Sequence, residues 1–178
     1  MTRIRIVALL VVVLALGALG WQAFGHGNAN NLTAKNAELT VRWRGKYQGT
    51  ATLPATLNWC PVTRVGVLEA MSGDTGAVLV LYERDSLTAG PHAAVSPELS
   101  AATPRPGATF VMRWVRTRPD TAMTGFRSEG GTARIQFAGG TASGDINVRM
   151  RAVTTPDTLV MQGVFTKVPV LTTAKGCT

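Results

Sequence analysis

The chain has 178 residues, enough for one domain with a short appendage. Hydrophobic residues make up 46% of it and glycine has no regular spacing, which excludes a collagen-like or wholly disordered chain. Lys and Arg total 18 against 10 Asp and Glu, giving a formal net charge of +8. Such a protein can bind nucleic acid, anionic lipid or an acidic protein surface, and the cellular compartment decides among these partners.

Residues 1–25 predict a membrane anchor. The run from Ile6 to Phe24 contains 19 residues, and Gln22 is its only strongly polar side chain. As a helix with a rise of 1.5 Å per residue, the run spans roughly 28 Å, close to the hydrocarbon thickness of a bilayer. The basic residues before the run and the aromatic residues at its end predict a cytoplasmic N-terminus and an interfacial belt. These anchor flanks are Arg3, Arg5, Trp21 and Phe24.

A cleaved signal peptide is the alternative for the same segment, because small residues permit cleavage near residue 20 or 25. Cleavage would release a secreted protein. We expect instead a single-pass protein of the inner (cytoplasmic) membrane, with its N-terminus inside and its C-terminal domain in the periplasm or outside the cell. Residues 26–37 are small and polar and predict a flexible tether.

Residues 38–178 predict an extracytoplasmic all-β domain. Apolar and polar residues alternate with period two, as in Leu39 to Arg44, and turn residues recur every 8–12 positions. This spacing is typical of a β-sandwich, here of about seven to nine antiparallel strands, with a partly closed barrel as the second choice. Residues 77–82 are apolar on both faces, which indicates a central strand.

Residues 85–107 interrupt the strand rhythm and contain four prolines. Structureless connections of this length are uncommon in compact domains, and those that occur are usually functional or disordered. We expect a long loop here, either a surface crossover between two sheets or a binding loop. Residues 96–100 within it predict one short helical turn.

Cys60 and Cys177 are the two cysteines of the chain. Disulfides persist outside the cytoplasm, and two cysteines in an exported domain are the simplest arrangement for one bridge. Their spacing is a poor metal signal, and a nucleophilic cysteine needs a nearby base, for which His26 and His92 are the only histidines. We therefore predict a structural disulfide that fastens the C-terminal tail.

Motifs for catalysis, cofactors or metals are not evident. The chain has no G-x-S-x-G elbow, no H-E-x-x-H and no phosphate-binding glycine loop. His92 lies near Ser96, as half of a hydrolase site would, but a single loop histidine is more often solvated. Glu69, Glu83 and Asp85 are better explained by salt bridges than by a glycosidase pair. We expect a protein that is not an enzyme and needs no cofactor.

Arginines occupy mostly outward positions of the predicted strands. The ordinary explanation is a solvated sheet face on which charge prevents edge-to-edge pairing. The functional explanation is contact with anionic lipid head groups or an acidic protein neighbour. Nucleic acid is excluded by the expected compartment and by the absence of an RNA-binding motif. The expected partner contacts are Arg42, Arg44, Arg113, Arg116, Arg149, Arg151 and His92.

The sequence leaves three functions open. The first is a non-catalytic accessory subunit, held by the bilayer-spanning helix and packed against other subunits of a membrane protein complex. The second is an anchored or secreted binding module for a small ligand or a cell-envelope polymer. The third is an enzyme of unknown type.

Overall fold

The computed structural model describes residues 37–116, 122–172 and 177. The predicted anchor, its flanking residues and most of the tether therefore lie outside the described part of the chain. Among the described residues, no helix is both long enough and apolar enough to cross a membrane. The described elements are β1 (Glu38–Gly45), β2 (Gly49–Cys60), β3 (Val65–Ser72), β4 (Thr75–Tyr82), β5 (Gly90–Val95), η1 (Pro97–Ala102), β6 (Gly107–Arg116), β7 (Ala122–Ala138), β8 (Thr141–Ala152) and β9 (Thr158–Thr172).

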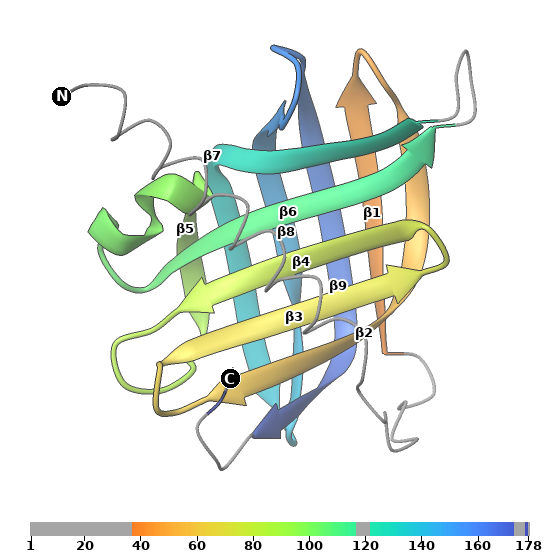
Figure 1. Ribbon diagram of the computed structural model, residues 1–178. Coiled ribbons are helices and arrows are strands. Elements are labelled where there is room, and N and C mark those ends of the chain that lie inside the picture. Colours follow the sequence, from red (N-terminus) through yellow and green to blue (C-terminus); the bar gives the residue numbers. More distant parts are fainter. Residues whose placement is uncertain (1–36, 117–121, 173–176, 178) are drawn as a thin grey trace, which may run out of the picture. The chain divides into compact units, whose positions relative to one another are not determined.

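The described strands form one sheet that closes on itself, in the order β1-β2-β3-β4-β6-β5-β7-β8-β9, with β9 pairing back to β1. Figure 1 shows β3, β4 and β6 across the front of this closed barrel and β8 and β9 running behind them. The all-β prediction is confirmed. The two-sheet sandwich is not confirmed, because the described strands all belong to a single sheet.

The alternation seen in the sequence places apolar side chains inside the barrel. Leu39, Val41 and Trp43 of β1 are buried, whereas Arg42, between the last two, and Arg44, after them, are exposed. Side chains from each of the described strands fill the interior of the barrel, which forms a packed hydrophobic core. The largest side chains that are fully buried there include Phe110, Phe126 and Phe165.

Residues 85–107 are more ordered than the sequence predicts. They contain β5 and η1, which includes the helical turn expected near residue 97. β5 fits between β6 and β7 where these two strands separate: β7 pairs with β6 up to Arg127 and with β5 from Gly130 onward. The buried Ser128 lies at this fork, where its hydroxyl donates to the Val95 carbonyl and accepts from the Phe110 N–H. It thereby satisfies backbone groups that the fork would leave unpaired.

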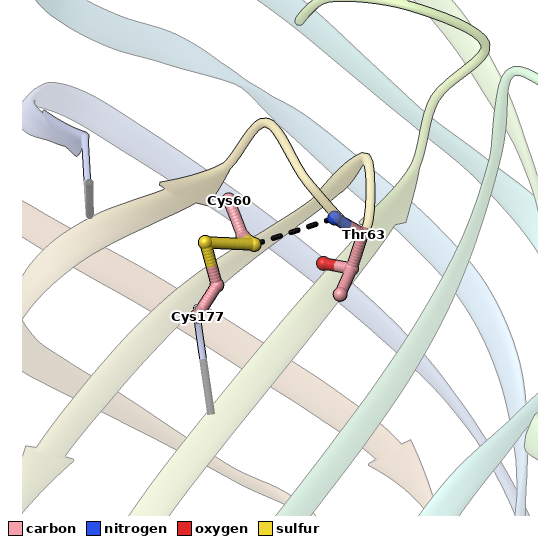
Figure 2. The surroundings of a disulfide bond; sticks show 3 residues. All are labelled: Cys60, Thr63 and Cys177. Carbon is pink, nitrogen blue, oxygen red and sulfur yellow. Dashed lines mark hydrogen bonds between the residues drawn. A yellow bond between two sulfur atoms is a disulfide. The ribbon is translucent and has the colours of Figure 1, made fainter. Parts of the chain in front are cut away.

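The structure contains the predicted disulfide between Cys60 and Cys177, with their Cα atoms 5.5 Å apart. Cys60 is the last residue of β2, and the Thr63 N–H lies 3.4 Å from its Sγ (Figure 2). The bond attaches the end of the chain to the β2–β3 corner. No free cysteine exists among the described residues.

Candidate functional site

Most of the predicted contact arginines gather on one part of the outer barrel surface, formed by β7, β8, β9 and β1. We call this surface the arginine face. Its cationic residues are accompanied by two carboxylates and by exposed residues of β8 and β9. The arginine face comprises Arg42, Arg44, Glu129, Thr132, Arg134, Asp145, Asn147, Arg149, Arg151, Val160, Gln162 and Val164.

Strand register sets the spacing of these side chains. Val160 of β9 pairs with Arg44 of β1 on one side and with Arg149 of β8 on the other. Neighbouring strands lie about 4.8 Å apart, so the two arginines are separated by roughly 10 Å and flank one exposed valine. In the next outward row, Gln162 lies between Arg42 and Asn147.

The arginine face carries an excess of positive charge. Glu129 lies near both Arg149, at 3.6 Å, and Arg151, while Arg134 lies 3.7 Å from Asp145. Arg42 and Arg44 have no acidic partner among the described residues. Five arginines thus face two carboxylates, and the defined set has a net charge of +3.

An open depression of about 460 Å³ lies within this face, between β7 and β8. Arg134 and Arg149 stand at two sides of it, and Asn147 and Thr132 contribute an amide and a hydroxyl. β7 supplies two adjacent glycines, Gly130 and Gly131, at a bulge in its pairing with β8. The remaining lining residues are Asp145 and Val160.

Gly130 and Gly131 differ in whether the surrounding structure requires glycine. At Gly131, φ is +131°, and a Cβ atom would lie 2.2 Å from the Asn147 carbonyl oxygen of the neighbouring strand. Backbone packing therefore requires glycine at 131. A Cβ at Gly130 would meet nothing within 4 Å and the residue does not have a positive φ. Glycine at 130 leaves the depression open without being needed by the backbone.

The other predicted contact residues lie elsewhere. Arg113 is exposed on β6, away from β1, β8 and β9 in the strand order. Arg116 ends β6, and its side chain is outside the described part of the structure. The expectation that His92 is solvated is wrong, because its side chain is fully buried. It cannot serve as a surface contact.

His92 and Glu83 form a buried hydrogen-bonded pair. His92 Nε2 lies 2.8 Å from Glu83 Oε1, and its Nδ1 lies 3.2 Å from the Gly90 carbonyl oxygen. The Thr88 N–H and hydroxyl also donate to the Glu83 carboxylate, at 3.1 and 2.7 Å. The Gly90 carbonyl oxygen can only accept, so His92 Nδ1 carries the hydrogen of that contact. The pair holds the β4–β5 connection against the barrel.

This pair is not a catalytic site, because the exposed fractions of the two side chains are 0% and 1% and no substrate can reach them.

The other residues considered for catalysis make ordinary surface contacts. Ser96 donates a hydrogen bond to Glu98. Asp85 lies 3.7 Å from Arg64, a surface salt bridge of the kind the sequence predicts. Within the described ranges, no group of three or more His, Cys, Asp or Glu residues could hold a metal ion.

Comparison with known proteins gives no relative: no family model, no curated protein and no solved structure matches this chain. Only the site itself therefore bears on the function.

Sequence alternation identifies the arginines as outward residues, but it gives no indication of the depression. The one available signal is the Gly130-Gly131 pair inside a strand, a pattern that marks a bulge or a close backbone approach.

Proposed function

We propose that this protein is a non-catalytic accessory module whose arginine face binds an acidic surface of a larger membrane protein complex. An N-terminal helix anchors it in the membrane and the barrel stands on the extracytoplasmic side. A binding module for a cell-envelope polymer is the alternative. The arginine face serves either role, and the experiments below separate them.

One observation carries this proposal: Arg42 and Arg44 are exposed and have no acidic partner within the described ranges. On β9, the exposed Val160 lies opposite Arg44, and the exposed Val164 lies opposite Thr40, the outward residue before Arg42. Unpaired arginines offer planar guanidinium groups that bind carboxylates through two parallel hydrogen bonds. Exposed fractions of 49% for Val160 and 55% for Val164 add apolar area that a partner would bury. Charge with apolar area at its centre is the composition of a protein-binding surface.

The test uses two matched variants of the full-length protein. Arg44→Gln removes an unpaired arginine from the arginine face, and Arg113→Gln removes an exposed arginine from β6. After gentle solubilisation, the co-purifying complex is identified and its association with each purified variant is measured at several salt concentrations. We expect Arg44→Gln to slow association and to weaken its salt dependence.

Arg113→Gln should behave as the unchanged protein does. Equal effects of the two variants would show that only the overall charge matters and would contradict the proposed face. Unaltered association of Arg44→Gln would contradict it as well.

A further inference from the structure

We propose that the depression between β7 and β8 is a binding site for a carboxylate side chain, carried on an acidic peptide segment of the partner. This inference rests on the proposed function and specifies the chemistry recognised on the β7–β8 side of the arginine face. The ligand class follows from the charge of the lining, the space within it and the neighbouring apolar surface.

The lining provides guanidinium donors whose acidic neighbours in the described part of the chain lie beyond hydrogen-bond distance. Arg149 Nε lies 3.6 Å from Glu129, and an Arg134 terminal nitrogen lies 3.7 Å from Asp145. Both separations exceed that of a hydrogen bond. The two guanidinium groups are therefore oriented by their acidic neighbours while N–H groups remain for an incoming anion.

Space for the ligand comes from Gly130. A Cβ atom at this position would meet nothing within 4 Å, and neither the backbone conformation nor a neighbouring atom demands glycine there. The depression has a volume of about 460 Å³, within the range of ligand sites. It accommodates a side chain and part of the backbone that carries it.

The surroundings favour an acidic peptide over a neutral sugar. No aromatic ring, on which a sugar could stack, is among the residues that line the depression. A neutral sugar would therefore have to bind through the Asn147 amide, the Thr132 hydroxyl and apolar contact alone. Val160, at the edge of the site, can pack against the methylene groups of a glutamate while Arg149 binds its carboxylate. The Asn147 amide is placed to donate to the second oxygen or to the peptide backbone.

The inference is tested with N-acetyl-hexaglutamate amide as the probe and N-acetyl-hexaglutamine amide as its neutral counterpart. Binding to the full-length protein in detergent is followed by calorimetry and by the NMR shift of the Asn147 side-chain amide. We expect the hexaglutamate to bind and to shift this amide, and the hexaglutamine to do neither. Gly130→Val and Arg149→Gln should each lower the affinity at least tenfold, and Arg113→Gln should change it less than twofold.

Thermal unfolding of each variant confirms that it is folded, and Arg149→Gln tests the site without adding any side chain to β7. Equal losses for Arg149→Gln and Arg113→Gln would overturn the inference, because binding would then reflect overall charge. Binding of an oligogalacturonate but not of the hexaglutamate would also overturn it, since the carboxylate would belong to a polysaccharide. A Gly130→Val protein that still associates with the membrane complex through Arg44 would contradict this inference while leaving the proposed function intact.

Discussion

At the scale of single residues, positions that the sequence groups together have different physical roles in the structure. Gly130 and Gly131 are adjacent in β7, yet only Gly131 has a left-handed φ and a neighbouring carbonyl oxygen in the space of a Cβ atom. His92 and Arg113 both belong to the predicted contact set, yet one is inside the protein and the other is on its surface. Stability and binding can therefore be altered separately.

The glycine pair gives a matched prediction. Gly131→Ala should lower the free energy of unfolding by at least about 2 kcal/mol, because it combines a strained φ with a clash against β8. Gly130→Ala should change it by less than about 0.5 kcal/mol, since a methyl group there meets nothing within 4 Å. Urea unfolding of the two variants measures both values. Equal destabilisation would show that the bulge is not arranged as described.

The buried Glu83–His92 pair predicts a large cost for removing one partner. Glu83→Gln replaces one accepting oxygen by an amide NH2 group and should destabilise the protein by about 1–3 kcal/mol, because a buried donor is left without an acceptor. The double variant Glu83→Met/His92→Leu should recover part of that loss, because it removes most of the buried polar groups of the pair. Chemical denaturation at neutral pH measures the difference. A loss below about 0.5 kcal/mol for Glu83→Gln would contradict the buried hydrogen bonds described for this pair.

Asp157 provides a prediction about pH. Hydrogen bonds from Lys46, at 3.0 and 3.1 Å, and then from Thr155, at 2.8 Å, lower the pKa of this carboxyl below its ordinary value. They favour the ionised form in the folded state, so their contribution to stability is present above the ordinary pKa. It is lost as the pH falls through the lowered one.

Lys46→Met should return the pKa of Asp157 toward its ordinary value, as measured by NMR titration of the carboxyl carbon. An unchanged midpoint would show that Lys46 does not act on Asp157 in solution. Because the contact joins the β1–β2 and β8–β9 turns, the titration also reports whether these two turns meet.

At the scale of elements, the sequence predicts strands well where alternation is long and turns are marked. The turns at residues 73–74 and 139–140 separate β3 from β4 and β7 from β8, as their glycines indicate. β5 was missed because it has only six residues, includes Pro91 and lies among other prolines. Its pairing with a strand some 40 positions later, at Gly130 to Ile135, is a tertiary contact that no local pattern reveals.

The presence of β5 changes how residues 85–107 can be tested. Deleting residues 91–104 would remove a strand of the sheet and the buried His92, so loss of binding in that variant would report unfolding. Substitutions on the outer surface of β1 and β8 avoid this problem. Only such variants distinguish contact from stability.

The disulfide fastens one element, the C-terminal tail, to the end of β2. Its cysteines are 117 positions apart, and closing a loop of that length is worth on the order of 4–5 kcal/mol in the chain-entropy model. Cys177→Ser should therefore lower the unfolding free energy by up to this amount, as measured by denaturation under non-reducing conditions. A variant as stable as the unchanged protein would show that the bond is not formed in solution.

At the scale of the whole molecule, sequence alternation determines which residues face inward but not which strands are neighbours. A sandwich and a closed barrel have the same period of two, and the difference here is the pairing of β1 with β9 from the far end of the chain. The same limit applies to the site. The outward direction of Arg44 and Arg149 was predictable, whereas their position on either side of Val160 depends on strand order.

In the closed strand order, β4 lies about half-way round the ring from β9, which carries Gln162 of the arginine face. We propose that the arginine face meets a membrane protein, so the outer side of β4 serves as its control. A photoreactive residue placed at Gln162 lies in the middle of the arginine face, and one at Val78 lies outward on β4. The two positions form a matched pair in the full-length protein.

The most direct measurement is photo-crosslinking of these two variants in intact membranes, followed by mass spectrometry of the products. We expect a defined crosslink to one membrane protein from position 162 and none to that protein from position 78. No protein product from position 162, or the same product with equal yield from both positions, would contradict it.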